Sequence, residues 1–334
     1  MTDLSLTPRT ITSASARRLW LEPAERVILQ ITGMVVFLNL VQILWRGVAV
    51  DWWGYGTLTL VSLACFAGGQ YYRISGRSAR IGLALVCTGL FPVFSWSIVM
   101  FNYLMMPTVH GNIDQWLVWV DSLVGYHWPD VIHWAAENPG LNTMFRIAYM
   151  TTIPQIGLLI IVLGLTGRAR QLHTMMVSIT ITSVLAVVFW GYFPTHGAKS
   201  LFMLPSAVEM AANPIVTTQY GRDLLHMAAN GPGLLSPDSV KGLIAFPSYH
   251  AVLAFTAIYA MRGVRFLFPV YLVVNLLIIP ATPLHGGHHL VDILGGLILF
   301  LIGTFMAERL VARYYAGKDD CLPKDAAKAP PAQP

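Results

Sequence analysis

Two short segments near the C-terminal end of the chain place ionisable side chains at the mouths of apolar stretches. Residues 246–250 have the sequence Phe-Pro-Ser-Tyr-His, and residues 285–292 have the sequence His-Gly-Gly-His-His-Leu-Val-Asp. His288 and Asp292 stand four residues apart, so on a helix they share one face and the carboxylate can hold the imidazole in one tautomer. An imidazole held in this way can act as a nucleophile, and His250 can supply a proton from a different segment.

Apolar runs long enough to cross a bilayer surround both segments. Of 334 residues, 55% are hydrophobic and 11% are charged, and runs of roughly 20 apolar residues recur along the chain. The sequence therefore predicts an all-α, polytopic transmembrane helix bundle of about eight helices. The expected helices cover residues 27–45, 55–71, 81–106, 145–165, 175–193, 248–261, 266–281 and 290–311. Polar residues and glycines in the second leave a re-entrant or interfacial segment open there.

The basic residues test this arrangement independently, because short cytosolic loops carry most of the Lys and Arg in membrane proteins. One set of alternate segments holds 16 of the 21 basic residues. The other set holds Arg46, Arg146, Lys199, Arg222 and Lys241. We therefore expect both termini in the cytosol and the two histidine segments on the outer side. The net charge of +5 then reflects topology and not nucleic-acid binding.

Four parts follow along the chain. We expect a cytosolic N-terminal segment at 1–26, two N-terminal membrane helices at 27–80, a catalytic membrane domain at 81–315 and a disordered cytosolic tail at 316–334. The first apolar run has no small-residue cleavage site, which favours a retained helix over a signal peptide. Two long outer segments, 107–144 and 194–247, are expected to form a cap of interfacial helices. Cys65, Cys87 and Cys321 have no pair spacing, so neither a disulfide nor a cysteine metal site is predicted.

At the two histidine segments the sequence resembles the type-2 phosphatidic acid phosphatase superfamily of integral-membrane lipid phosphatases and phosphotransferases. Pro247, Ser248 and His250 match its Pro-Ser-x-His element, and His288 with Asp292 matches its His-x-x-x-Asp element. The resemblance implies a six-helix phosphatase-type core with both elements at outer helix starts.

Two departures accompany the resemblance. No Lys-x6-Arg-Pro element occurs, and Thr282 stands where the phosphatase branch has an arginine. Residues 193–199, with the sequence Phe-Pro-Thr-His-Gly-Ala-Lys, are instead similar to the sphingolipid-synthase branch, to which inositol phosphorylceramide synthase belongs.

The chemistry assigns roles to these residues. A neutral imidazole is a good nucleophile toward phosphorus, so His288 is the expected nucleophile, Asp292 orients it, and His250 protonates the leaving oxygen. The charge on the phosphate oxygens needs donors, and the candidates are Ser248, Lys199, Gly287 and Lys241.

Each of these residues also has a structural interpretation. Ser248 can cap a helix, Asp292 can complement a helix dipole, and the lysines can be solvated loop charges. We favour structural roles for His196, His285 and His289.

The predicted function is a lipid phosphate phosphatase or phosphotransferase with a phosphohistidine-type intermediate on the extracytoplasmic face. The alternative is a head-group transferase that moves a phospho-head group to a lipid alcohol acceptor. A zinc hydrolase built on His250, His285, His288, His289 and Asp292, or a transporter, stays open as a further class.

We expect no cofactor and no metal, with a lipid phosphate or phospholipid and the bilayer as partners. Compact loops and the absence of sorting signals favour a bacterial inner membrane, with the site facing the periplasm.

Overall fold

The computed structural model describes residues 21–317. The expected N-terminal segment at 1–26 and the expected tail at 316–334 therefore lie almost entirely outside the described residues. Within residues 21–317 the secondary structure is helical throughout, apart from one isolated bridge between Val50 and Leu235. The all-α prediction is confirmed.

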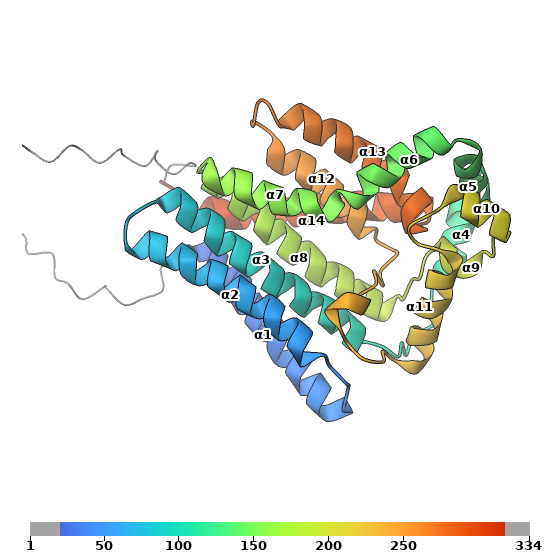
Figure 1. Cartoon of the computed structure of the whole chain (residues 1–334), viewed down its shortest axis with the longest axis horizontal. Coiled ribbons are helices and arrows are strands. Elements are labelled where there is room, and N and C mark those ends of the chain that lie inside the picture. Colours follow the sequence, from blue (N-terminus) through green and yellow to red (C-terminus); the bar gives the residue numbers. More distant parts are fainter. Residues whose placement is uncertain (1–20, 318–334) are drawn as a thin grey trace, which may run out of the picture.

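Eight regions of long helix correspond to the eight apolar runs. They are α1 (Pro23–Arg46), α2 (Trp52–Ile74), α3 (Ala79–Leu104), α6 with α7 (Pro139–Met150 and Thr152–Leu165), α8 (Ala169–Tyr192), α12 (Tyr249–Met261), α13 (Phe268–Gly286) and α14 (Leu290–Tyr314). Along the chain they run alternately toward one end of the bundle and back (Figure 1). The arrangement is that of a membrane helix bundle.

Five of these helices are long and apolar enough to cross a membrane, and the bent pair of α6 and α7 makes a sixth. Helix α2 lies outside this set, and α12 has only 13 residues. The chain therefore has several helices that suit an integral membrane protein. By length and composition, fewer of them than eight are complete spans.

Three expected boundaries were clearly wrong. Helix α8 begins at Ala169, six residues before the expected start at 175. The run at 145–165 is not one helix, because the chain bends by 47° between α6 and α7. Pro154 lies four residues after Met150 and cannot donate the hydrogen bond that would continue the helix through this point. Helix α13 continues to Gly286, beyond the expected end at 281, although Pro280 and Pro283 lie inside it. A helix in a membrane bundle tolerates such prolines, because neighbouring helices and side chains can satisfy the backbone groups that the prolines leave without a partner.

Small residues allow the helices to approach closely. A Cβ added at Gly89 in α3 would lie 2.6 Å from the carbonyl oxygen of Ser62 in α2. One added at Gly303 in α14 would lie 2.2 Å from a side-chain carbon of Thr182 in α8. These glycines hold α2 against α3 and α14 against α8, as small residues do in membrane bundles.

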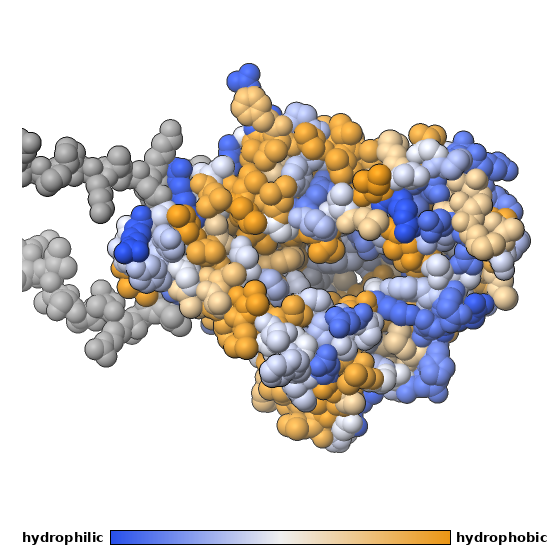
Figure 2. Space-filling view, in the orientation of Figure 1, coloured by the Kyte–Doolittle hydropathy of each residue, from blue (hydrophilic) through white to orange (hydrophobic). Residues whose placement is uncertain are grey.

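The segments 107–144 and 194–247 contain short helices at one end of the bundle, away from the described ends of the chain (Figure 1). They are α4 (Asp114–Ser122), α5 (Trp128–Glu137), α9 (Ala198–Leu201), α10 (Ser206–Ala212), α11 (Thr218–Asn230) and the 3-10 helix η1 (Pro237–Ser239). Figure 2 shows apolar side chains along the flanks of the long helices and more hydrophilic ones over the short helices. We refer to these short helices together as the cap.

Candidate active site

His288 and Asp292 meet at the start of α14. Nδ1 of His288 lies 3.0 Å from Oδ2 of Asp292, and both side chains are buried. The same carboxylate oxygen accepts the backbone N–H of His289 at 2.9 Å. Burial lowers the pKa of His288 below its ordinary value, although the hydrogen bond to Asp292 opposes this effect. The imidazole is therefore neutral near pH 7, with its other nitrogen left for chemistry.

The start of α14 is held by a side chain from the cap. Oδ2 and Oδ1 of Asp121, in α4, accept the backbone N–H groups of Leu290 and Val291, each at 3.0 Å. The first N–H groups of a helix have no partner inside it, so a carboxylate at this position stabilises the helix terminus. Asp121 thereby fixes the turn that carries His288 and Asp292.

His250 approaches from a different helix. It lies in the first turn of α12, where Ser248 is the N-cap and accepts the backbone N–H of Ala251. The backbone N–H of Ser248 donates to the carbonyl oxygen of Asp292 at 2.9 Å, which ties the starts of α12 and α14 together. The rings of His250 and His288 consequently stand with their centres 6.3 Å apart.

Both histidines line a cavity of about 400 Å³. Its walls are mainly apolar and come from α3, α7, α8 and α12, with Ile98, Val99, Ile153, Val187 and Leu253 among the lining residues. Tyr149, Lys199 and Lys241 add polar groups to the lining. The space-filling view shows the molecule hollowed in the region where α8 approaches α11 (Figure 2). The cavity thus combines apolar walls with two imidazoles and two lysine side chains.

Lys199 is a buried cation at this cavity. Its Nζ donates to the carbonyl oxygen of Gly286 at 3.0 Å, and the side chain is 4% exposed. Burial lowers its pKa to about 8, against the opposing charges of Asp292 and Asp114. Lys199 is therefore still mostly charged at neutral pH and can meet an anionic phosphate.

The other three expected phosphate contacts are placed differently. Lys241 lines the cavity but forms an ion pair with Asp223 in α11. Ser248 is fully buried as a helix cap and is not among the cavity-lining residues. Gly287 has a φ of +63°, and an added Cβ would lie 2.6 Å from Cδ of Lys199. The structure thus brings His250, His288, Lys199 and Lys241 to one cavity, with Ser248, Gly287 and Asp292 beneath its lining.

A family model described as the PAP2 superfamily matches residues 115–306. The chain belongs to the PAP2 superfamily. No curated protein and no solved structure matched the chain in the corresponding comparisons. Members of this superfamily are phosphatases or phosphotransferases, so the matched region is that of an enzyme acting on phosphate esters. All of the cavity's imidazoles and lysines lie inside the matched residues.

Two acidic residues of the cap, which no sequence motif singled out, support the segment 285–292. Asp114 accepts the backbone N–H groups of His196 and Gly197 at 2.8–3.0 Å, and its carboxylate lies 3.8 Å from Nε2 of His289. Asp121 lies 3.3 Å from Nδ1 of His289. The two aspartates are seven residues apart, which places them on the same face of one helix. This spacing of two aspartates, inside a segment otherwise rich in aromatic residues, was the sequence signal that could have identified them.

His289 lies close to two carboxylates of the cap. Burial opposes protonation, but the nearby carboxylates of Asp114 and Asp121 outweigh it and raise the pKa of His289 to about 9. The interactions of Asp114 with His196 and His289 outweigh the effect of burial and hold its pKa well below the usual range. Asp114 thus joins α4 to the loop before α9 and to the segment 285–292. The structural roles favoured for His196, His285 and His289 stay predictions.

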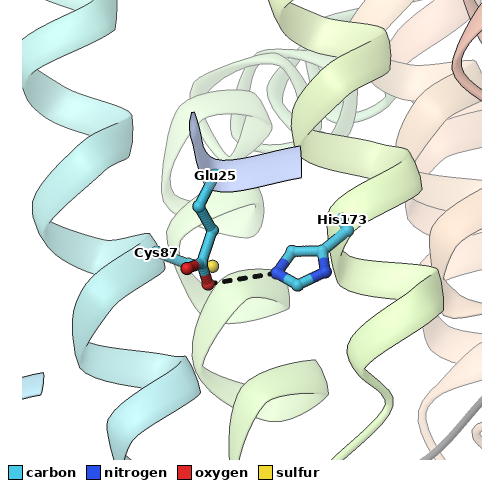
Figure 3. A group of neighbouring side chains, drawn as sticks. All are labelled: Glu25, Cys87 and His173. Atoms are coloured by element: carbon cyan, nitrogen blue, oxygen red, sulfur yellow. Dashed lines mark hydrogen bonds and ion pairs between the residues drawn. The ribbon is translucent and has the colours of Figure 1, made fainter. Parts of the chain in front are cut away.

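A second group of possible metal ligands lies at the end of the bundle away from the cap. Within residues 21–317, three potential ligand atoms lie within 4.8 Å of one another at Glu25, Cys87 and His173 (Figure 3). Both carboxylate oxygens of Glu25 are already bound by Arg73 at 2.6 Å, and one also lies 3.1 Å from Nε2 of His173. Because a guanidinium occupies the carboxylate, the arrangement is a buried ion-pair network joining α1, α2 and α8.

The histidines of the zinc alternative have separate partners. Nε2 of His285 lies 3.2 Å from the carbonyl oxygen of Asn142, and Nδ1 of His288 is bound to Asp292. His289 faces Asp121 and Asp114. The three side chains contact different partners, and this geometry does not favour one metal ion shared among them.

Proposed function

We propose that the protein is an integral-membrane lipid phosphatase or phosphotransferase that works through a phosphohistidine at His288. The observation that carries this proposal is the pair of imidazoles at one cavity, of which only His288 has a carboxylate behind it. A carboxylate on the far nitrogen stabilises the positive charge that an imidazole gains when it attacks phosphorus. The two rings therefore suit different steps.

In the first step, the free nitrogen of His288 attacks phosphorus and forms an N–P bond. The P–O bond on the opposite side breaks, its electron pair stays on the leaving oxygen, and that oxygen takes a proton from His250. The centres of the two rings lie 6.3 Å apart at the same cavity, so both imidazoles can reach one phosphate group. The ammonium group of Lys199 offsets charge on the equatorial oxygens.

In the second step, water or an alcohol attacks phosphorus from the side that the leaving group vacated. His250, now neutral, accepts the proton of this nucleophile, and the N–P bond breaks to return His288 to its starting state. Water yields free phosphate, and an alcohol yields a new ester. Hydrolysis and transfer therefore use the same residues.

The apolar cavity supports a lipid substrate. Its mainly aliphatic walls open beside the cap, at the end of the bundle away from the basic loops that contain Arg77, Arg168 and Arg265. Basic loops face the cytosol in membrane proteins. We infer that both termini are cytosolic and that the cavity faces the extracytoplasmic side, which is the periplasm for an inner-membrane protein.

A second candidate function, transfer of a phospho-head group between lipids, is favoured by the charge of the cavity. Of its two lysines, Lys241 is paired with Asp223, whereas Lys199 has no carboxylate partner among the ion pairs of residues 21–317. One unpaired cation matches a monoanionic phosphodiester better than a dianionic monoester. Thr282, at the position of the phosphatase arginine, is fully buried and donates to the carbonyl oxygen of Ile278.

The test uses purified protein in detergent with a panel of long-chain phosphate monoesters and phospholipids. Each is incubated with and without a diacylglycerol or ceramide acceptor, and products are identified by mass. We expect wild-type protein to release phosphate or to form a new phosphodiester, and His288→Ala to do neither. Rapid quenching of a reaction with ³²P-labelled substrate should trap an alkali-stable, acid-labile label on the wild-type protein. Turnover by His288→Ala at the wild-type rate would exclude the proposed mechanism.

A further inference from the structure

The two lysines of the cavity have different partners. Nζ of Lys199 donates to the carbonyl oxygen of Gly286, in the turn before α14. Nζ of Lys241 forms an ion pair with the carboxylate of Asp223, in α11. Nζ of Lys199 lies 5.6 Å and Nζ of Lys241 lies 4.9 Å from the ring centre of Tyr220, which also lines the cavity. The two ammonium groups therefore border the same part of the cavity, but only that of Lys241 is paired with a carboxylate in residues 21–317.

Lys241 stands at the boundary between two cavities. The first is the cavity of about 400 Å³ that both histidines line. The second has a volume of about 310 Å³, and its lining includes Lys241, Tyr103, Asp223, His226 and Ser239. Asp223 is not among the lining residues of the first cavity. The ion pair therefore holds the ammonium group of Lys241 on the side of the second cavity.

The backbone of Lys241 is fixed, whereas its side chain is only partly enclosed. The hydroxyl oxygen of Tyr103 accepts the backbone N–H of Lys241 at 2.5 Å, and the hydroxyl donates to the carbonyl oxygen of Lys241 at 3.2 Å. The side chain of Lys241 is 29% exposed, and that of Asp223 is 40% exposed. Because a lysine carries its charge on a flexible four-carbon stem, the ammonium group can turn from one cavity to the other while the backbone stays in place.

Asp223 is itself held in a position that keeps the pair closed. Nε2 of Gln219, one turn earlier in α11, donates to Oδ1 of Asp223 at 2.8 Å. Arg222 in turn donates to Oε1 of Gln219 at 2.8 and 3.0 Å. The hydrogen bonds from Lys241 and Gln219 lower the pKa of Asp223 below its ordinary value. Asp223 is therefore a carboxylate at neutral pH, and its charge offsets that of Lys241.

We propose that Asp223 is a specificity-determining residue: it pairs with Lys241 and thereby leaves Lys199 as the one cavity lysine, within residues 21–317, that is free to meet the phosphate. One cation matches a monoanionic phosphodiester, whereas a dianionic monoester lacks a second one. This inference rests on the proposed function, in which Lys199 faces the phosphate, and it names the residue that sets the charge of the substrate. Asp223 acts by positioning Lys241 and does not itself contact the phosphate.

The test measures binding separately from turnover. Variants are made in the His288→Ala protein, which is expected to leave the ligands intact, and Kd is measured by titration calorimetry in detergent. The ligands are dodecyl phosphate and methyl dodecyl phosphate. At about pH 7.5 the first is mostly a dianion, because the second pKa of a phosphate monoester is about 6, and the methyl ester is a monoanion.

The variants separate the charge of Asp223 from its packing. Asp223→Asn removes the charge and keeps the size of the side chain, and Asp223→Glu keeps the charge. Asp130→Asn is the matched control, because it removes the same charge from another exposed residue of the cap.

We expect Asp223→Asn to bind dodecyl phosphate at least about 10-fold more tightly than the parent, because Lys241 can then donate a charge-assisted hydrogen bond to the second negative charge. Its Kd for methyl dodecyl phosphate should stay within about 3-fold of the parent, since Lys199 already meets a single charge. Asp223→Glu and Asp130→Asn should match the parent with both ligands. Adding Lys241→Gln to Asp223→Asn should remove the gain. In the protein with His288 intact, Asp223→Asn should lower KM for dodecyl phosphate more than it changes kcat.

Other outcomes overturn the inference in distinguishable ways. An equal gain for both ligands would show that Asp223 repels anions in general. Dodecyl phosphate binding that is not strengthened would show that Lys241 does not reach the phosphate. A gain that persists in the variant with Lys241→Gln would show that Asp223 does not act through Lys241. None of these outcomes touches the proposed function, which would be removed only if His288→Ala turned over its substrate at the wild-type rate.

Discussion

The carboxylate of Asp121 accepts the backbone N–H of Leu290 at 3.0 Å, across 169 positions of sequence. The first helix of the cap therefore caps the N-terminus of α14, the helix that carries Asp292. Since Val291 donates to the same carboxylate, the cap and the motif form one hydrogen-bonded unit. The cap therefore helps to fix the position of the candidate site.

Replacing Asp121 with Ala should lower both stability and activity. Loss of a capping side chain costs about 1 kcal/mol, and here two N–H groups and the charged His289 would lose their partner together. We expect a lower Tm, and a lower kcat because the turn that carries His288 becomes less ordered. Asp130→Ala is the control, because Asp130 is exposed on the next cap helix and pairs only with exposed His127. Indistinguishable melting of the two variants would contradict this role.

The rate should depend on pH through Lys199. Burial lowers the pKa of its ammonium group to about 8, so the cation is lost as pH rises through that value. We expect kcat/KM to fall above about pH 8, measured between pH 6 and pH 10. Lys199→Arg, which keeps its charge throughout this range, should retain some activity and shift the fall to higher pH. If kcat/KM falls at the same pH in both proteins, the fall is due to a group other than Lys199.

The stability should depend on pH through His289. Its pKa is raised to about 9 in the folded protein, from an ordinary value of 6.5. A group with a raised folded pKa contributes stability that is fully present below pH 6.5 and is lost as pH rises through about 9. Tm should therefore fall across this range, and less steeply in His289→Asn. His226→Asn, at an exposed histidine of α11, should leave the slope as in wild type. Parallel slopes in all three proteins would refute the assignment.

Gly287 should not tolerate a side chain. At a φ of +63° an L residue is strained, and the new Cβ would lie 2.6 Å from Cδ of Lys199. Gly287→Ala is expected to lose most activity, because Lys199 or the turn before His288 must move. In Gly125→Ala the φ of +72° is similar, but no atom lies within 4 Å of the added Cβ, so only the backbone penalty, of about 1 kcal/mol, applies. Equal activity in the two variants would show that the contact with Lys199 is immaterial.

The proposed sidedness predicts which introduced cysteines react from outside the cell. Gly111 lies in an exposed segment at the cap end, and Ser75 lies in the turn between α2 and α3. In a protein whose native cysteines are replaced, Gly111→Cys should react with an impermeant maleimide in intact cells. Ser75→Cys should react only after permeabilisation. The reverse pattern would move the cavity to the cytosolic side.

The helices were predictable because their signal is local. A run of apolar residues must form a helix in a membrane, since every backbone N–H there needs a partner within the segment. The observed bounds of α14, Leu290–Tyr314, begin at the expected residue. Two of the errors fell at prolines: Pro154, where the chain bends, and Pro280 and Pro283, which lie inside one continuous helix. A proline marks a place where a helix can break, and the surrounding packing decides the outcome.

The sequence by itself determined the all-helical class and the pairing of His288 with Asp292, because both depend on residues a few positions apart. Only the tertiary structure decided that Tyr149 stacks on His250 and that Asp223 pairs with Lys241. These contacts join helices through side chains whose types are common, and nothing in their local spacing specifies a partner. Distant residues meet only when the packing of apolar faces brings their helices together, and that packing is a property of the whole chain.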